Sequence, residues 1–339
     1  MSGGVDSSTA AWLLREAGCR VEGAFMSRET CPCDAGQLEA ARRVAEFLEI
    51  PLHVVDLSAA FEVLIDYFCS EYLRGRTPNP CAICNEQIKF ARLIDEADRL
   101  GFDYLATGHY VRSASCDGRR CLRRASDAEK DQSYYLFALS QKHLARAAFP
   151  LGDRTKDEVR GLARKAGLPA AETEESQDVC FVPQGGYARL VRERVGSQVR
   201  PGDIVDTSGK TLGRHEGIID FTVGQRRGVG VAAGEPVYVV DVDPRTNRVV
   251  VGRDEDLLAD TLVAENVNWV GRPLPREPLR CAVQIRYRAQ PVDATVIPVG
   301  RFGAKVSFDE PQRAVTPGQA AVFYDDELLL GGGWITREQ

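Results

Sequence analysis

The chain has 339 residues, of which 44% are hydrophobic, and this length predicts two or three domains that each bury a core. No run of about 18 uncharged apolar residues occurs, which argues against a membrane-spanning protein. The amino terminus also lacks the basic and apolar regions of a secretion signal. We therefore expect a cytoplasmic protein without a membrane partner, whose ten cysteines are mostly reduced thiols.

The charge of the chain is unevenly distributed. The formal net charge of −6 argues against indiscriminate binding of nucleic acid. Residues 112–200 nevertheless hold 17 Lys or Arg against 12 Asp or Glu. A basic middle in an acidic protein can still receive a polyanion.

The first third of the chain alternates between helical and strand patterns. Apolar residues at helical spacing predict helices at residues 8–16, 37–48, 61–73 and 88–100, and short apolar runs predict strands at 21–26, 53–57 and 103–107. Such alternation is typical of βα units around a parallel sheet. We expect the α/β class with a doubly wound parallel sheet.

The remainder of the chain changes in texture near residue 195. Thr155 can cap a helix whose third residue is Glu158. From about Val199, valine-rich runs separated by Gly, Pro and Asp predict hairpins. We expect a catalytic domain at residues 1–195, a small β-rich central domain at 196–255, and a β-rich C-terminal domain at 256–339.

A glycine-rich loop opens the chain. In "SGGVDSSTAAWLL", Gly3 and Gly4 allow backbone amides to approach an anion, Ser7 and Ser8 add hydroxyl donors, and the following helix favours phosphate at its N-terminus. No lysine follows, so this is not the GxxxxGK[ST] loop. The alternative is an ordinary βα turn. Such a loop normally follows a strand, and we expect that a strand upstream of Met1 is missing.

The second motif is "RTPNPCAICNEQIKF", which holds Cys81 and Cys84. Pro78 and Pro80 predict an extended segment, with a helix beginning near Glu86. Cys84 would then lie near a helix N-terminus, a position that lowers a thiol pKa. The CxxC spacing also suits half of a zinc site, provided that a second pair exists downstream.

Two later cysteine groups bear on that choice. Cys116 and Cys121 lie in a polar, arginine-rich hairpin at the wrong spacing for zinc. In "EESQDVCFVPQGGY", Cys180 follows acidic residues and precedes Phe181, which indicates the edge between a loop and a strand. Taken alone, Cys180 can equally be a buried thiol.

These motifs together carry a family resemblance. SGGVDSS resembles the pyrophosphate loop of the PP-loop ATP pyrophosphatases. With NPCxxCNxxIKF, TGHY, DQSYYLFALSQ, FPLGDRTKDEVR and SQDVCFVP in this order, the chain resembles the tRNA-specific 2-thiouridylases, which place sulfur on C2 of the wobble uridine. The resemblance extends through FTVGQRRGVGV, IRYR and VTPGQAAVFY. It implies an adenine nucleotide α-hydrolase-like PP-loop domain first and a C-terminal domain like a β-barrel.

The resemblance also implies a mechanism. ATP with Mg²⁺ would adenylate C2 of uridine 34, and a cysteine persulfide would then deliver sulfur, with release of AMP and pyrophosphate. Cys180 would carry the persulfide, and Cys84 would resolve it through a Cys84–Cys180 disulfide, which in a cytosolic protein is transient. The implied partners are tRNA and a sulfur-donor protein, and we expect a monomer.

The implied binding residues form three sets. The nucleotide would contact Ser2, Gly3, Gly4, Val5, Asp6, Ser7, Met26 and Gly108, with Asp6 near the magnesium and pyrophosphate. The flipped target base would lie beside Asn79, Pro80 and Cys81. Further tRNA contacts would come from His109, Lys130, Asp131, Gln132, Arg286, Tyr287 and Gln319. Without the family, His109 can be a hydrogen-bonded histidine at a strand end, and Arg286 a sheet-surface arginine.

One position departs from the family pattern. Cys81 stands where well-known members have Asp, which could act as a base or hold the target base. Cys81, Cys84 and Cys180 instead resemble the three-cysteine [4Fe–4S] sites of related PP-loop thiolation enzymes, in which one open iron could bind sulfide. The persulfide route is the favoured hypothesis.

Other readings of the sequence remain open. The chain could be another PP-loop adenylating ligase, such as an amide-forming synthetase, although those lack paired reactive cysteines. It could also be a tRNA-binding or metal-sensing module without turnover, or an inactive paralogue.

Overall fold

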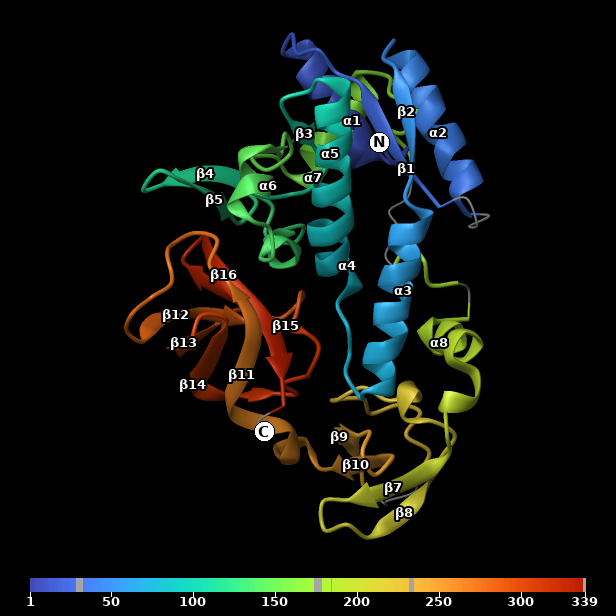
Figure 1. Ribbon diagram of the computed structural model, residues 1–339, viewed down its shortest axis with the longest axis vertical. Helices are drawn as coiled ribbons and strands as arrows, with labels where there is room; N and C mark the ends of the chain where they lie inside the picture. Colours follow the sequence, from blue (N-terminus) through green and yellow to red (C-terminus); the bar gives the residue numbers. More distant parts are fainter. Residues whose placement is uncertain (29–32, 174–178, 184, 232–234, 338–339) are drawn as a thin grey trace.

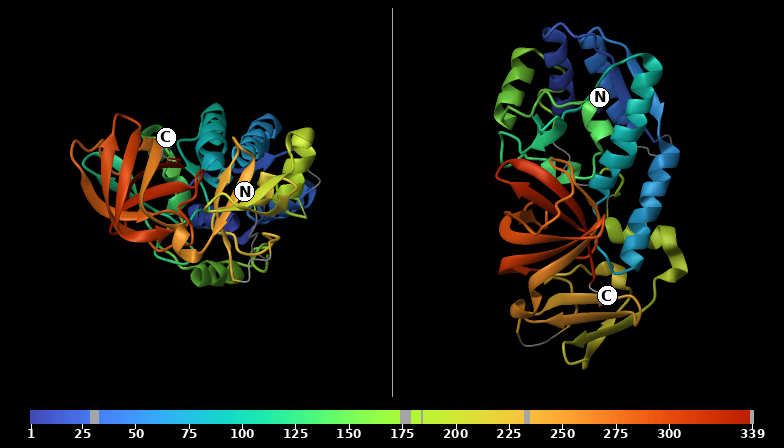
Figure 2. Two further views of the ribbon diagram at one scale, coloured as in Figure 1. Left: turned by 90° about the horizontal axis from the view of Figure 1, so that it is seen from below. Right: turned by 60° about the vertical axis from the view of Figure 1, so that its left-hand side comes forward.

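The computed structural model describes residues 1–28, 33–173, 179–183, 185–231 and 235–337. Three parts follow one another along the chain (Figures 1 and 2). An α/β part lies at the top of Figure 1, with a barrel and a small sheet below it. The predicted class, a PP-loop α/β domain followed by a small β domain and a barrel, is confirmed.

The α/β part contains two parallel strand pairs. Strand β1 (Gly23–Ser27) pairs with β2 (Leu52–Asp56), and β3 (Leu105–Ala106) pairs with β6 (Ala147–Ala148). Its helices are α1 (Val5–Glu16), α2 (Cys33–Phe47), α3 (Ser58–Leu73), α4 (Pro80–Ile83), α5 (Phe90–Leu100), α6 (Gln141–Ala145), α7 (Lys156–Lys165) and α8 (Tyr187–Val195). Short helices η1 (Cys84–Lys89, a π-helix) and η2 (Ser133–Leu136) complete it.

The predicted capping of α7 is confirmed. The Thr155 hydroxyl accepts from the Glu158 amide, and the Glu158 carboxylate accepts from the Thr155 amide, so both members of the capping box are formed. This box sets the first turn of α7 and hence the position of Lys156. The predicted arginine-rich hairpin is also present, as β4 (Arg112–Cys116) and β5 (Arg119–Arg123).

The central part is a four-stranded sheet. Its order is β8 (Thr211–His215), β7 (Gly202–Asp206), β10 (Arg248–Gly252) and β9 (Tyr238–Asp243). Strands β7 and β10 are parallel, and the other pairs are antiparallel. Alternate valines such as Val249 and Val251 point into a core with Ile204 and Val239, because successive strand residues face opposite sides. Short helices η3 (Gly196–Gln198), η4 (Ile218–Asp220) and η5 (Asp254–Leu257) flank the sheet.

The last part is a closed barrel of six strands. The order is β11 (Leu258–Asn268), β14 (Gly303–Arg313), β13 (Val292–Val299), β12 (Leu279–Gln284), β15 (Ala320–Asp325) and β16 (Leu328–Thr336), and β16 pairs back with β11. Closure leaves each strand paired on both sides, which removes exposed edges. Buried Val283, Val296, Val306 and Phe323 share its core.

The three parts meet around the segment that precedes α4. In Figure 1, α3 descends toward the central sheet and the chain then returns upward into α4. At the turn, Gly75 has φ +65°, and a Cβ there would lie 2.4 Å from the Val242 carbonyl oxygen of β9. The Thr77 amide then donates to the Pro317 carbonyl of the barrel at 2.8 Å. The barrel and central sheet therefore fix the path of the chain into Cys81.

Candidate functional site

The loop before α1 has the form of an anion site. Gly4 is the N-cap residue in extended conformation, and no described side chain caps the helix. The first-turn amides, which have no partner within a helix, are therefore left for a ligand or water. Gly3 has φ +76°, and a Cβ there would lie 2.7 Å from the Ala40 Cβ of α2. Only glycine fits that packing, which holds the loop against α2.

Gly108 and Met26 occupy different places around this loop. A Cβ on Gly108 would lie 2.9 Å from the Asp6 carbonyl carbon and from the Ser7 nitrogen, so Gly108 lies directly against the loop. Met26 is on β1 and packs on the apolar cluster that also contains Cys84. The Ser2 and Ser7 hydroxyls lie 3.2 Å apart at the loop. The structure thus brings most of the predicted nucleotide residues together.

Sequence reasoning missed a lysine at this loop. The buried Lys156 ammonium donates to both Asp6 carboxylate oxygens, at 2.7 and 2.8 Å. The Tyr110 hydroxyl donates to the same carboxylate at 2.7 Å. The loop lacks a lysine in its own sequence, and α7 supplies one from 150 positions away. The sequence signal that could have indicated this lysine is its place as the first residue of a helix with a predicted capping box.

The segment with the CxxC motif is helical earlier than predicted. Helix α4 begins at Pro80, with Asn79 as N-cap, whose Oδ1 accepts from the Ala82 amide at 3.3 Å. The predicted start near Glu86 is wrong, because Pro is favoured at the first helical position, where its missing amide costs nothing. Cys81 lies in the first turn, and Cys84 begins the π-helical turn η1.

The predicted low pKa of Cys84 is also wrong. Burial raises the pKa of the Cys84 thiol, while the nearby Lys89 and Arg28 charges only partly oppose that shift. Burial likewise raises the pKa of Cys81 to about 11, although part of its side chain is exposed. Both thiols are therefore neutral near pH 7. The helix N-terminus that was expected to lower the Cys84 pKa lies a full turn earlier.

Cys180 lies in a turn beside these thiols, not at the expected strand edge. Its carbonyl accepts from Arg28 Nη1 at 3.0 Å, and its side chain is exposed. Cys180, Cys84 and Cys81 lie within electrostatic range of one another. All three are free thiols in this structure. No group of three or more His, Cys, Asp or Glu within the described ranges is arranged to hold a metal ion.

Two residues expected beside the target base are buried. Pro80 is the first residue of α4, and Asn79, 6% exposed, has its side-chain oxygen engaged as the helix cap. The Tyr134 hydroxyl interacts with Asn79 and donates to the Ala320 carbonyl of the barrel. Cys81 is the exposed member of this set.

The predicted tRNA residues of the α/β part have partners inside the protein. His109 is 9% exposed and hydrogen-bonds Thr107 Oγ1 at 2.8 Å, and burial lowers its pKa well below the usual value. The buried Asp131 carboxylate pairs with Arg124 at 3.0 Å and accepts from the Ala125 and Ser133 amides. These neighbours satisfy His109 and Asp131 internally, as the alternative interpretation of His109 anticipated.

The next residues along the chain follow the same pattern. Gln132 accepts from the Tyr110 amide at 3.0 Å. Lys130 is partly buried, and its backbone amide donates to the Asp127 carbonyl. Lys130 therefore presents part of its side chain at the surface beside two internally bonded neighbours.

The predicted tRNA residues of the barrel join it to the other parts. Arg286 Nη2 donates to the Ala314 carbonyl at 2.6 Å and to Thr316 Oγ1 at 2.8 Å, and approaches the Val223 carbonyl of the central part at 3.4 Å. Gln319 Nε2 donates to the Thr77 and Pro78 carbonyls. These bonds hold the chain just before Cys81.

Tyr287 has an aromatic environment. Its ring lies 4.5 Å from that of Tyr135, at an interplanar angle of 36°. The Tyr134 ring is 6.2 Å away. Three tyrosines from the barrel and the α/β part therefore gather close to the Cys81 segment, since Tyr135 lies within electrostatic range of Cys81.

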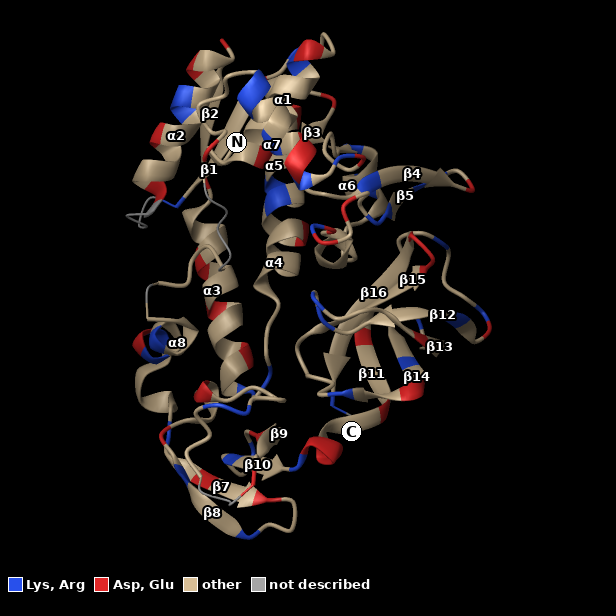
Figure 3. Ribbon diagram, turned by 180° about the vertical axis from the view of Figure 1, so that it is seen from behind, with Lys and Arg blue, Asp and Glu red and all other residues tan. Residues whose placement is uncertain are grey.

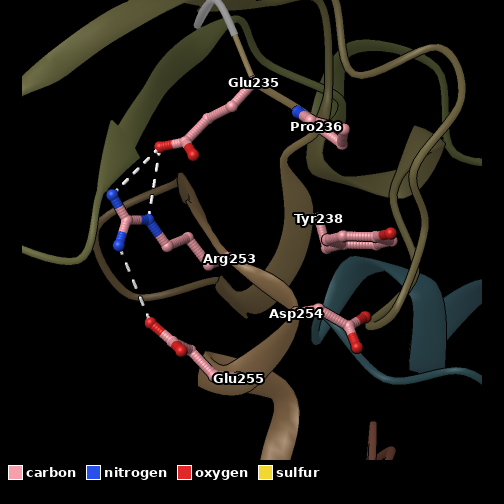
Figure 4. Close-up of a pocket in the computed structure, with 6 residues that line it drawn as sticks. All are labelled: Glu235, Pro236, Tyr238, Arg253, Asp254 and Glu255. Atoms are coloured by element: carbon pink, nitrogen blue, oxygen red, sulfur yellow. Dashed lines mark hydrogen bonds and ion pairs between the residues drawn. The ribbon is translucent and has the colours of Figure 1, made fainter.

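The charge pattern and one surface hollow lie outside the predicted site. Figure 3 shows basic and acidic positions interspersed along helices such as α2 and α7. Figure 4 shows a hollow by the central part, in which Arg253 is paired with two glutamates. The residues that line it are Glu235, Pro236, Tyr238, Arg253, Asp254 and Glu255, none of which belongs to the predicted site. No helix in the described parts is long and apolar enough to cross a bilayer.

Three family models together match nearly the whole chain. They are described as a tRNA methyl transferase HUP domain at residues 1–184, a tRNA methyl transferase PRC-barrel domain at residues 189–253, and an aminomethyltransferase beta-barrel domain at residues 259–335. The first covers the loop, Lys156 and all three thiols.

Similar proteins of known name include a tRNA-specific 2-thiouridylase MnmA of Syntrophotalea carbinolica, 49% identical over 99% of this chain and 97% of that protein. One of Chloroflexus aggregans is 48% identical over 100% of this chain and 98% of that protein. Among solved structures, the U34-tRNA thiolase NcsA of Methanococcus maripaludis with its [4Fe-4S] cluster matches with 18% identity and a TM-score of 0.36, covering 58% of this chain and 66% of that one.

Proposed function

Because this chain belongs to the tRNA-specific 2-thiouridylase family, we propose that it is a tRNA-uridine 2-sulfurtransferase that converts the wobble uridine of tRNA to 2-thiouridine with ATP. The observation that carries the proposal is that two free thiols, Cys84 and Cys180, lie within electrostatic range of each other in a chain that also has a phosphate-type loop and that aligns with thiouridylases from end to end.

The loop residues would bind the triphosphate of ATP. Backbone amides of the first turn of α1 donate to phosphate oxygens, and the Lys156 ammonium adds a buried positive charge. The Asp6 carboxylate, held by Lys156 and Tyr110, is the group that suits Mg²⁺. Bound Mg²⁺ would neutralise charge on the departing pyrophosphate. The residues therefore fit an adenylation in which the uridine C2 oxygen attacks the α-phosphate and pyrophosphate leaves.

The two thiols would then exchange the C2 oxygen for sulfur. The terminal sulfur of a persulfide on Cys180 attacks C2, and AMP leaves with the original oxygen. The Cys84 thiolate next attacks Cys180 Sγ, so the Cys84–Cys180 disulfide forms and the transferred sulfur departs with its electron pair as the thiolate of 2-thiouridine. A thiol reductant must afterwards reduce the disulfide, and a sulfur-donor protein must reload Cys180.

The positions around the thiols suit a neutral resting state. Since burial raises the pKa of the Cys84 thiol, the neutral thiol is the main form near pH 7, and the Lys89 and Arg28 charges favour its thiolate when the proton leaves. We assign no chemical step to Cys81, because the persulfide route needs two thiols and Cys84 and Cys180 supply them.

A [4Fe–4S] cluster on Cys81, Cys84 and Cys180 is the alternative route. The three thiols share one region, but as arranged among the described residues they do not form a metal-holding group. We therefore favour the persulfide route and assign no step to a cluster.

The tRNA would approach the exposed side of Cys81 and Cys180. We propose that Tyr287, next to Tyr135, supplies aromatic surface for the unstacked anticodon, because bases stack on such rings. Lys130 would contact tRNA phosphate. Arg286, Gln319, His109, Asp131 and Gln132, which are internally bonded, would shape the surface that tRNA meets. We propose that one protein chain carries the complete site.

The descriptions of two family models mention methyl transfer, which is a different activity. The thiols of Cys84 and Cys180 favour sulfur chemistry instead. Methyl transfer needs no pair of converging thiols, whereas a persulfide relay needs both. The same thiols disfavour an amide-forming PP-loop ligase, which adenylates a carboxylate and needs no sulfur carrier.

The decisive experiment is thiolation of a purified tRNA with uridine at the wobble position. Anaerobically purified protein receives ATP, Mg²⁺ and a small-molecule persulfide, iron is quantified, and nucleosides are analysed by mass spectrometry. ATP-dependent 2-thiouridine from iron-free protein supports the proposal. Product that appears only after cluster reconstitution establishes the cluster route. No product in either condition refutes the sulfurtransferase assignment.

A further inference from the structure

Arg28 is a buried charge at the end of β1. It is 6% exposed and packs its guanidinium 5.2 Å from the centre of the Phe61 ring. The Asp34 carboxylate accepts from Arg28 Nη2 at 2.5 Å and Nε at 3.1 Å, and also from the Arg28 backbone amide. An arginine held by a two-pronged carboxylate contact has a fixed orientation.

The remaining arm of this fixed guanidinium reaches the Cys180 segment. Nη1 donates to the Cys180 carbonyl at 3.0 Å, a bond that joins positions 152 residues apart. Arg28 also lies within electrostatic range of both Cys84 and Cys180. The bond uses the backbone of Cys180, so the sulfur is left unoccupied by it.

A second anchor lies on the next residue. The Phe181 ring packs edge-on against Phe68 of α3 at 5.3 Å between centroids. Phe181 also borders the apolar cluster that contains Cys84. The turn that carries Cys180 is thus held at its carbonyl by Arg28 and at the following side chain by α3.

We propose that Arg28 is a positioning residue for sulfur transfer: the Asp34-held guanidinium ties the backbone of Cys180 to the end of β1 and so keeps the Cys180 sulfur within reach of Cys84. The inference rests on the sulfurtransferase function proposed above. It assigns to Arg28 a role that the motifs did not indicate. Arg28 follows the predicted nucleotide residue Met26 by two positions and belongs to none of the quoted motifs.

The physical reason is the narrow geometry of a disulfide. Two cysteines can bond only when their Cα atoms lie about 4.4–6.8 Å apart. Cys180 is on an exposed turn, whereas Cys84 is on a helix. Without a tether, the turn would sample many positions in which the Cys84 thiolate could not attack Cys180 Sγ. A tether at the carbonyl restricts the backbone and leaves the sulfur able to carry a persulfide.

The test measures formation of the Cys84–Cys180 disulfide in full-length protein, with no tRNA or ATP. Diamide, which takes up the two electrons and two protons that the thiols release, is added, and peptides are quantified by mass spectrometry over time. We expect Arg28→Gln to slow disulfide formation about tenfold, because effective concentration depends on how well the two groups are held together. Arg28→Lys, which keeps the charge but has a single point of contact, should restore part of the rate.

The control variant is Arg164→Gln. Arg164 also pairs with a carboxylate, that of Glu172 at 2.8 Å, but its side chain is exposed on α7. Its disulfide rate should equal that of the wild type. A wild-type rate in Arg28→Gln would overturn the proposal.

Loss of folding is distinguished by a second variant. Melting temperatures are measured for each protein, and if Arg28→Gln is unfolded, Asp34→Asn is used, which leaves the guanidinium in place but frees it from its carboxylate. Slower disulfide formation in folded Asp34→Asn supports the proposal, and an unchanged rate overturns it. A wild-type protein that forms the disulfide but makes no 2-thiouridine would refute the proposed function, while a slower disulfide in Arg28→Gln would still show that Arg28 holds Cys180 near Cys84.

Discussion

The starts of helices α1 and α4, which carry the predicted site residues, differ in the groups that are bonded to their first-turn amides. Helix α1 begins after Gly4 with no side-chain cap among the described residues, so its first-turn amides remain open to an anion. Helix α4 begins after Asn79, whose side chain occupies the Ala82 amide. The glycine start therefore leaves the first-turn amides of α1 open to phosphate, whereas the asparagine start of α4 occupies one such amide, that of Ala82. Cys81 and Cys84 follow the start of α4, where the Asn79 side chain already bonds a first-turn amide.

The largest effect should come from Cys84, and it separates the two chemical routes. Cys84→Ser should abolish 2-thiouridine formation, because the resolving nucleophile is lost. Under the persulfide route, Cys81→Ser should retain activity within about threefold, since that route uses only the thiols of Cys84 and Cys180. Nucleoside mass spectrometry measures both variants. Equal loss in the two variants would instead support the cluster route.

A substitution of Lys156 tests the anion site at the open start of α1. Lys156→Met should lower ATP-dependent thiolation about 100-fold, because one preorganised charge at the phosphate loop is removed and Asp6 loses its partner. Lys165→Met, on the same helix α7 but exposed, is the matched control. ATP-dependent release of pyrophosphate in the presence of tRNA is the measurement. A Lys156→Met protein with the activity of Lys165→Met would contradict the assignment.

The buried position of Cys84, which follows the capped start of α4, predicts that the rate of sulfur transfer depends on pH. Burial raises the Cys84 pKa, so its thiolate is the minor form at pH 7 and increases about tenfold per pH unit below that pKa. Single-turnover release of product from persulfide-loaded protein should therefore become faster as the pH rises from 7 to 8.5. A rate that is flat or falls over this range would show that Cys84 deprotonation does not limit the step.

The smallest effect concerns the cap of α4. Asn79→Ala should lower the free energy of unfolding by about 1 kcal/mol, as expected for loss of an N-cap. Ser140→Ala removes the equivalent cap of α6, where the hydroxyl accepts from the His143 amide. We expect both variants to lose similar stability by chemical denaturation, but only Asn79→Ala to lose activity. Equal activity in both variants would show that the cap of α4 stabilises the fold without supporting the active site.

Local sequence patterns were sufficient for much of the fold. The predicted helix at 61–73 lies within α3, the predicted strand at 53–57 overlaps β2, and the Thr155 cap forms as expected. These features depend on neighbours within a few positions. The start of α4 was misplaced because proline was interpreted as a breaker, although Asn79 before Pro80 is a strong start signal.

The sequence by itself determined the loop, the thiols, the order of the three parts and the family to which they point. Only the tertiary structure decided that Lys156 reaches Asp6, that Arg28 holds Cys180, and that Gln319 of the barrel supports the chain before Cys81. It also reversed the expected pKa shift of Cys84. The reason is that these properties depend on burial and on contacts between residues 150 or more positions apart, which no local pattern encodes.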